Sequence, residues 1–382
     1  MFCASFCRSI HSSIKKLILF RICKMGGLLS TFCMMIKHLF HKDAHASGSW
    51  SDLPADIVIT IVEHLHYSDQ IRFRAVCKSW RASSANAVKF ADKLPWLFAY
   101  STLYRFNNRF SSFCYLYEPC HRQKHTIELK QALLGARVHA SQYGWLLFSK
   151  QATLSLHYLF MFYSPFTGKI IELPALESMY FHDRILFSAS PTSPECVVFV
   201  VRTYHPEEFR ISTCSPGDRA WTMHLFDGFH GSIDGMAFMD GVLYCSFSQS
   251  VLGAFEVATK VWRICQHNPV PRSISSCNRL IESDGKLLMP CYDDVQFRWR
   301  VLSFDWSQKK WFEIESLGGK LLFLGCTTSM AVPAVGEASE FANKILSDCF
   351  HPSCPQIYPE INECGEYGWL MTNIWIQPPE QI

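Results

Sequence analysis

The sequence predicts an α+β multidomain protein, in which a small module of three helices precedes a mainly β domain, most simply a β-propeller of about six blades. Three observations predict this: apolar residues at helical spacing near residue 60, short apolar strands between turn residues after residue 140, and two sequence elements that recur. We expect the 382 residues to form a basic, poorly ordered extension over 1–49, the helical module over 50–90 and the propeller-like domain over 91–376.

The helical module is expected to begin at Pro54, because proline suits the first turn of a helix, where an N–H would have no partner. Ser68 can cap a second helix over 69–76, and "CKSWRASS" over 77–84 predicts a third. So short a module buries little of its own surface, and we expect a partner to cover part of its apolar face. That face follows the first helix at helical spacing, as Ile57, Val58, Ile61, Val62 and Leu65.

The stretch "WSDLPADIVITIVEHLHYSDQIRFRAVCKSWR" over 50–81 strongly resembles the F-box. The resemblance implies docking on the adaptor subunit of an SCF-type cullin-RING ubiquitin ligase, and through it on the cullin and RING subunits. An apolar helix face laid into a groove would supply this contact. Trp80 is the expected main anchor, because large aromatic residues dominate interface energetics. The adaptor-binding positions that the resemblance implies are Leu53, Pro54, Ile57, Val58, Ile61, Leu65, Val76, Cys77 and Trp80.

Two elements recur in the long β-rich region. A glycine opens an apolar strand at Gly144, Gly241 and Gly285. The second element consists of an apolar residue, a polar turn of six residues and then Trp or Ile. It begins at residues 163, 214, 255 and 304. In three of these four copies the last residue is a tryptophan: Trp221, Trp262 and Trp311. A period of roughly 40–50 residues built from hairpins indicates propeller blades, in which these glycines and tryptophans would be structural. A pair of β-sandwiches, or two separate β domains, is the alternative.

Five segments of this region, in order, resemble the plant domain of unknown function 295 of the KIB type, which commonly follows an F-box. They are "SQYGWLLF", "FYSPFTGKIIELP", "SIDGMAFMDGVLY", "RLIESDGKLLM" and "VLSFDWSQKKWFEIESLGGKLLFLG". The resemblance implies a kelch-like or propeller-like domain that holds a client protein for ubiquitination and proteasomal degradation. The protein would then be a non-catalytic receptor. The alternative is a propeller enzyme or ligand sensor, in which the helical module only packs or dimerises.

Charge and cysteine content exclude several classes of protein. The formal charge is +3, and residues 1–49 alone carry seven Lys/Arg and one Asp, so the remainder is about −3 and shows no basic stripe for nucleic acid. The 17 cysteines are odd in number, scattered and without a CxxC pair. We therefore expect reduced thiols and a nuclear or cytoplasmic protein.

The N-terminal extension allows three interpretations and no stable membrane span, because Arg21 interrupts its apolar run. A mistaken start codon or a disordered extension is the simplest. The absence of acids before Asp43 would also suit a transit peptide. "MGGLLS" from Met25 would suit myristoylation if translation began there.

We expect no catalytic residue, cofactor or metal. "HGSID" brings His230, Ser232 and Asp234 together, but neighbours on one face of a strand lie ~6.6 Å apart, too far for a catalytic triad. A second group could offer zinc ligands, although its spacing fits no familiar finger. It consists of Cys349, His351, Cys354 and Cys364.

Overall fold

The computed structural model divides into two compact units, Met1–Phe90 and Ala91–Ile382, which are taken separately below. It describes residues 53–63, 73–74, 76–84, 94–103, 111–118, 123–128, 130–152, 156–180, 183–205, 208–226, 231–247, 251–266, 279–293, 295–296, 298–325, 327–347 and 372–378. None of the helices in these ranges has the length and apolar character that crossing a bilayer would need.

The first unit contains helices α3 (Ala55–Glu63) and α5 (Lys78–Ser83). The helix α3 begins one residue after Pro54, where its start was predicted, and the Pro54 carbonyl oxygen accepts hydrogen bonds from the backbone N–H groups of Ile57 and Val58, each at 3.1 Å. Cys77 caps α5, where its Sγ accepts from the N–H of Trp80 at 3.4 Å. Most of the predicted second helix lies outside the described residues, so a count of three helices stays a prediction.

The two helices are joined by a small apolar core. The rings of Phe73 and Trp80 stack at 4.2 Å with an interplanar angle of 17°. Around them the i, i+3, i+4 spacing of α3 turns one face inward, so that Val58 and Val62 are fully buried. The core is therefore held mainly by one aromatic stack and one helix face.

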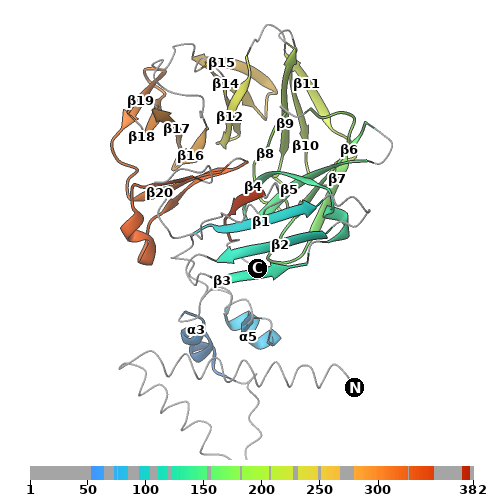
Figure 1. Ribbon diagram of the computed structural model, residues 1–382, viewed down its shortest axis with the longest axis vertical. Helices are drawn as coiled ribbons and strands as arrows, with labels where there is room; N and C mark the ends of the chain where they lie inside the picture. Colours follow the sequence, from blue (N-terminus) through green and yellow to red (C-terminus); the bar gives the residue numbers. More distant parts are fainter. Residues whose placement is uncertain are drawn as a thin grey trace, which may run out of the picture. The chain divides into compact units, whose positions relative to one another are not determined.

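The second unit is a β-propeller of six blades, and Figure 1 shows the sheets arranged around a common centre. The predicted mainly β domain and its blade number are thus confirmed.

The first three blades contain four strands each. Blade 1 contains β23 (Thr372–Ile376), β1 (Trp96–Leu103), β2 (Ser111–Glu118) and β3 (Gln123–Ile127). Blade 2 contains β4 (Arg137–Gln142), β5 (Trp145–Gln151), β6 (Tyr158–Tyr163) and β7 (Ile170–Leu176). Blade 3 contains β8 (Arg184–Phe187), β9 (Val198–His205), β10 (Glu208–Cys214) and β11 (Thr222–Phe226).

The remaining blades follow in chain order, and blade 6 differs from the others. Blade 4 contains β12 (Ile233–Met239), β13 (Val242–Phe247), β14 (Val251–Glu256) and β15 (Val261–Gln266). Blade 5 contains β16 (Ile281–Ser283), β17 (Lys286–Asp293), β18 (Arg298–Asp305) and β19 (Lys310–Ile314). Blade 6 has the order β21 (Ser329–Pro333), β20 (Lys320–Leu324), β22 (Ile345–Ser347), and β22 runs parallel to β20.

The two ends of the domain meet in blade 1 and close the ring. β23 pairs antiparallel with β1, so that Trp96 lies opposite Ile376 and Phe98 opposite Ile374. The inner strands then contact one another in the order β23, β4, β8, β12, β16 and β21. Each blade remains a separate sheet, with one edge strand at the outer circumference and one at the centre of the ring.

The middle strands of the blades bury both faces, because each blade packs against neighbours, whereas outermost strands such as β11 and β19 stay largely accessible. In β9, Val198 and Val200 join a cluster with blade 2, whereas Phe199 and Val201 join a cluster with blade 4. Similar clusters lie between blades 4 and 5, between 5 and 6, and between 6 and 1. Alternate residues thus serve opposite blades, which explains the continuous apolar runs of the sequence.

The recurring glycines lie at equivalent hairpins of blades 2, 4 and 5. Gly144, Gly241 and Gly285 have φ of 77°, 78° and 71° at the second turn position between the two inner strands, after a residue that also has positive φ. Such two-residue turns match the twist of the strands and favour glycine. Blade 3, where the glycine element is missing, has instead a longer connection over 188–197, held by the Ser188 hydroxyl, which donates to Glu195 O at 3.0 Å.

The recurring tryptophans begin the outermost strands of blades 3, 4 and 5. Trp262 lies opposite Phe255, and Trp311 opposite Phe304, across the outer hairpins. Trp221 directly precedes β11 and donates its Nε1–H to Pro174 O of blade 2 at 2.7 Å. As structural residues of a blade core they should be largely buried, but all three side chains are only half-buried. An outer strand lies at the circumference, where a large ring reaches beyond the neighbouring blade.

Candidate functional site

The residues expected to bind the adaptor fall into two groups in the helical unit. Val58, Ile61 and Trp80 are buried in its core. Leu65 lies outside the described residues. The remaining positions have accessible side chains: Pro54 is exposed, and Leu53, Ile57, Val76 and Cys77 are half-buried. Only this second group offers apolar surface that a partner could cover.

Trp80 was expected to be the main anchor on the adaptor, but its side chain lies in the core of the helical unit and not on its surface. Its side chain is 3% exposed, lies on Phe73 and belongs to the core of the unit. The turn that follows is fixed by Ser84, whose hydroxyl donates to Trp80 O at 2.6 Å. The geometry therefore indicates that Trp80 holds the two described helices together. Phe73 was not singled out from the sequence, although an aromatic residue between Arg72 and Arg74 was the available signal.

The propeller has a central channel, lined by residues from the inner strands of blades 2 to 6 and by Gln377 after β23. Its volume is about 420 Å³. The lining includes guanidinium, carboxylate, imidazole, amide and hydroxyl groups, besides a smaller number of apolar side chains. Sequence reasoning did not find this site, because residues that line it are isolated polar positions at the ends of six separate strands.

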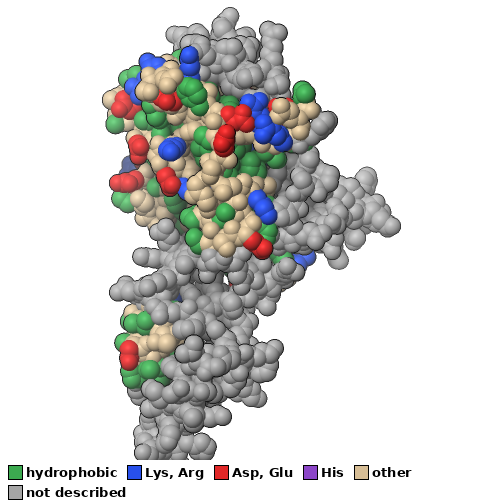
Figure 2. All heavy atoms as spheres, turned by 90° about the vertical axis from the view of Figure 1, so that its left-hand side faces the viewer, with side chains coloured by type: hydrophobic (Ala, Val, Ile, Leu, Met, Phe, Trp, Pro, Cys, Tyr) green, Lys and Arg blue, Asp and Glu red, His purple; other side chains and the backbone are tan. Residues whose placement is uncertain are grey.

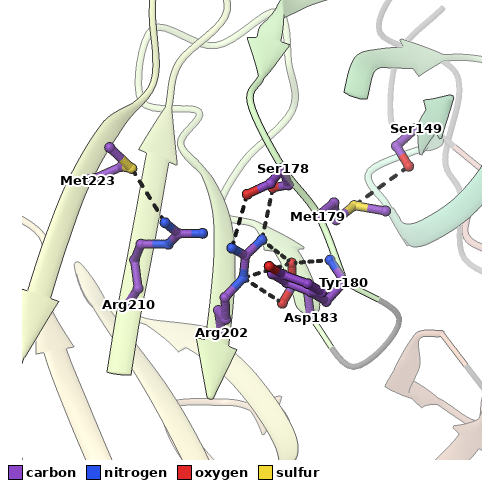
Figure 3. Close-up of polar contacts among 8 residues, drawn as sticks. All are labelled: Ser149, Ser178, Met179, Tyr180, Asp183, Arg202, Arg210 and Met223. Carbon is purple, nitrogen blue, oxygen red and sulfur yellow. Dashed lines mark hydrogen bonds and ion pairs between the residues drawn. The ribbon is translucent and has the colours of Figure 1, made fainter. Parts of the chain in front are cut away.

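A buried ion pair fixes the connection between blades 2 and 3 beside this channel. Figure 3 shows the guanidinium of Arg202 enclosed by Asp183, Ser178 and Tyr180. Its Nε and Nη2 donate to the Asp183 carboxylate at 3.1 and 2.8 Å, and Nη2 also donates to Ser178 O at 2.8 Å. The ring of Tyr180 lies 4.3 Å from the guanidinium. Both charges are withdrawn from solvent, so Asp183 is neutralised within the fold.

Three buried thiols of the propeller are held in their unreactive, protonated form. Burial raises the pKa of Cys114 and of Cys214 to about 12, and that of Cys196 to about 11. These thiols stay protonated near neutral pH, and the thiolate is the reactive form. Seven cysteines of the described ranges are free: Cys77, Cys114, Cys196, Cys214, Cys245, Cys265 and Cys291.

The structure describes only some of the residues that were considered as a catalytic triad or as metal ligands. Asp234 lies in the channel lining, whereas His230 is outside the described residues. Cys349, His351, Cys354 and Cys364 are outside them as well. Within the ranges given above, no three or more His, Cys, Asp or Glu side chains are grouped as metal ligands would be.

Comparison with known proteins assigns each of the two units to a known protein family. The KIB1-4 beta-propeller family matches residues 116–351, more than half of the chain. The chain belongs to this family. The F-box domain matches residues 50–89, which include the helical unit's two described helices. The resemblance to a plant F-box protein with a KIB-type propeller is thereby confirmed.

Relatives of the KIB1-4 propeller chain resemble it over most of their length. The Arabidopsis thaliana F-box/kelch-repeat protein At1g57790 is 30% identical over 87% of this chain and 95% of its own. The F-box protein At3g56470 and the F-box/kelch-repeat protein At3g18720, both also from Arabidopsis thaliana, are each 26% identical and are covered over 88% of their length. All three relatives are named as F-box proteins, and two of the names also include kelch repeats.

The charges on the surface of this F-box propeller protein are mixed. Figure 2 shows one face, on which basic and acidic side chains are scattered among hydrophobic ones. Among the described residues, Arg300 forms ion pairs with both Asp293 and Glu313 on blade 5. On the face shown, the charges of the described residues are interspersed and do not form the one-sign stripe with which proteins bind phosphate backbones.

Proposed function

We propose that the protein is the substrate-recognition subunit of an SCF-type cullin-RING ubiquitin ligase. The observation that carries this proposal is the combination of an F-box at residues 50–89 with a closed propeller of a family found behind F-boxes. The F-box would bind the adaptor, and through it the cullin and RING subunits. The propeller would hold a client protein, whose identity is set by loops rather than by the fold.

The proposed adaptor contact lies on the accessible apolar residues of the F-box. Leu53 and Pro54 precede α3, and Ile57 is one turn into it, so the three lie at one end of the helix. Val76 and Cys77 lie just before α5. A groove on the adaptor would remove their remaining apolar surface from water, which stabilises a complex by about 25 cal/mol per Å² before the costs of association.

The proposed role is one of positioning, without catalysis by this chain. A client held on the propeller presents its lysines to a ubiquitin thioester at high effective concentration, which raises the rate without new chemical groups. Buried, protonated thiols in the propeller support this assignment, because they leave these cysteines unsuited to carry ubiquitin themselves. We place the protein in the nucleus or cytoplasm, in keeping with its free cysteines.

The docking proposal is tested by pull-down of adaptor and cullin with the full chain. Leu53→Ala combined with Pro54→Ala should reduce recovery of both at least tenfold, because it truncates accessible side chains, of which Leu53 packs only in part against the core. Lys78→Ala, at an exposed polar position of α5, is the matched control and should leave recovery unchanged. Recovery of the adaptor by the double variant at the wild-type level would exclude this face.

A second variant separates contact from folding. Trp80→Ala should also abolish recovery of the adaptor, but through loss of the core stack with Phe73. Limited proteolysis of the full chain checks this: cleavage within residues 50–90 should accelerate for Trp80→Ala and stay unchanged for the Leu53/Pro54 variant. A protease-resistant Trp80→Ala protein that still fails to bind would show instead that Trp80 contacts the adaptor.

A further inference from the structure

The central channel has two distinguishable ends. Inner strands β8 and β12 begin side by side, since Arg184 Nε donates to Ile233 O at 3.3 Å. Strands β4 and β8 also end side by side, since the hydroxyl of Tyr143 donates to Ser188 O at 2.9 Å. We call the end at which β4, β8 and β12 begin the N-terminal mouth and the opposite end the C-terminal mouth.

The N-terminal mouth is rich in guanidinium groups. Arg137 is the first residue of β4, Arg184 the first of β8, and Arg279 precedes β16, so three blades each contribute one arginine to the channel lining. Arg137 and Arg184 are exposed and Arg279 is half-buried. Two acids of the lining also lie where the inner strands begin, Asp183 just before β8 and Asp234 in β12, and Asp183 forms an ion pair with Arg202.

The C-terminal mouth has the opposite character. Its acid is Glu282, next to the end of β16, whose Oε1 accepts from the N–H of Gly285 at 3.0 Å. Tyr143 lies near it: burial first, and then the charge of Glu282, raises the pKa of the Tyr143 hydroxyl. The described lining residues near this end include no lysine or arginine. The channel is therefore polarised along its axis, positive where the inner strands begin.

The positive charge of Arg137 at the N-terminal mouth also acts on a histidine inside the channel. His139 lies two residues after Arg137 on β4 and lines the channel, with Nε2 2.7 Å from Ser149 Oγ. Burial, and secondly the charge of Arg137, lowers the pKa of His139 to about 3. The imidazole is therefore neutral near pH 7. Among the described residues, only two buried side-chain oxygens have no hydrogen-bond partner, and one of them, Thr327 Oγ1, belongs to a lining residue.

We propose that the N-terminal mouth of this channel binds a small organic anion with two or more negative charges, held by Arg137, Arg184 and Arg279. A guanidinium group presents paired donors that suit both carboxylate and phosphate oxygens. In the lining, these three guanidinium groups outnumber the carboxylate of Asp234, so the net attraction grows with the negative charge of the anion. A volume of about 420 Å³ lies within the usual range of small-molecule sites, roughly 300–1,000 Å³.

The test is titration calorimetry of the full chain with pyrophosphate and with citrate, which separate phosphate from carboxylate chemistry. We expect saturable binding of at least one of them at about 0.15 M ionic strength, weakened by added salt. Arg137→Gln and Arg184→Gln should each raise the Kd about tenfold. The matched control is Arg219→Gln on the exposed outer hairpin of blade 3, which should leave the Kd unchanged.

Three results would overturn the proposal. The first is the absence of saturable binding by either anion. The second is a Kd that changes equally in the Arg219→Gln control and the channel variants. The third is binding of a hexaglutamate peptide when neither small anion binds, which would make the mouth a contact for a protein segment instead. Because Arg137 and Arg184 are exposed, unchanged thermal unfolding of both variants should show that they fold.

Discussion

The two units of this protein bury their apolar side chains in opposite ways. In the propeller the middle strands pack against the neighbouring blades on both faces, and the last strand pairs with the first to close the ring. The F-box has one small core around Phe73 and Trp80 and leaves apolar residues such as Pro54 and Ile57 accessible. This contrast predicts that the propeller folds without a partner, whereas the F-box needs one to cover its accessible apolar residues.

Separating the units should give the largest effect. Residues 91–382 alone should unfold in one cooperative thermal transition, because all six blades and the closing strand are present. Residues 50–90 alone should show no cooperative transition until the adaptor is added, because a chain of about 40 residues buries too little surface. Circular dichroism melts check both; a sharp transition of the isolated F-box would contradict the comparison.

The closing strand should be the most sensitive single point of the propeller. Trp375 is 2% exposed and packs on Phe323 with ring centroids 5.1 Å apart, between blades 1 and 6. Trp375→Ala should lower the free energy of unfolding by about 3–5 kcal/mol. Trp306→Ala is the control, since that ring is 41% exposed and its loss should cost less than half as much. Equal costs in denaturant titrations would argue against closure as the critical contact.

Packing within a blade should be next in size. A Cβ atom on Gly253 would lie 2.2 Å from the Trp262 ring, so Gly253→Ala forces the ring to move. We expect a loss of about 1–3 kcal/mol in the free energy of unfolding. Combining it with Trp262→Leu should remove most of the additional cost, because the smaller side chain leaves room. Fully additive costs in this double-mutant cycle would mean that the two positions do not clash.

A smaller effect should appear as a pH dependence confined to the propeller. The pKa of His139 is about 3 in the folded protein, against 6.5 for a free histidine, because the side chain is buried. The unfolded chain therefore takes up a proton that the folded chain does not. Stability is full above pH 6.5 and falls as the pH is lowered from 6.5 toward 3. The loss between pH 6.5 and 5 is about 2 kcal/mol.

Urea titrations of residues 91–382 at several pH values measure this slope. His139→Gln should flatten it, because the amide can occupy a similar volume without titrating. His224→Gln is a weaker comparison, since burial lowers the pKa of His224 as well, but without a large shift. If His139→Gln leaves the slope between pH 6.5 and 5 unchanged, other groups must account for it.

Much of the fold could be predicted from the sequence, because hairpins leave local signals. The turn pairs at Gly241 and Gly285 recur, and Phe255 and Trp262 stand at fixed spacing across an outer hairpin. The closure by β23 could not be predicted, because no local pattern joins residues so far apart in the chain. The strands of blade 6 could not be located from the sequence either, because they pair in the order β21, β20, β22 and lack the recurring elements.

The candidate sites were predicted unevenly, for a similar reason. The F-box positions follow from one continuous stretch, but the sequence could not distinguish the buried Trp80 from the accessible Ile57, since both are apolar at helical spacing. The channel arginines are far apart in the chain and lie among ordinary polar residues. Only the arrangement of the inner strands around one axis brings Arg137, Arg184 and Arg279 to the same mouth.

The pairing of β1 with β23 also sets an order of events during synthesis. Trp96 and Ile376, which lie opposite each other in blade 1, are made at nearly opposite ends of the propeller sequence. At about 5–20 residues per second, translation of the intervening segment takes on the order of 14–56 seconds. Throughout that time β1 has no inner neighbour, while the F-box has already left the ribosome. A nascent chain could therefore meet the adaptor before its propeller has closed, and the unpaired edge of β1 is where chaperones would be needed.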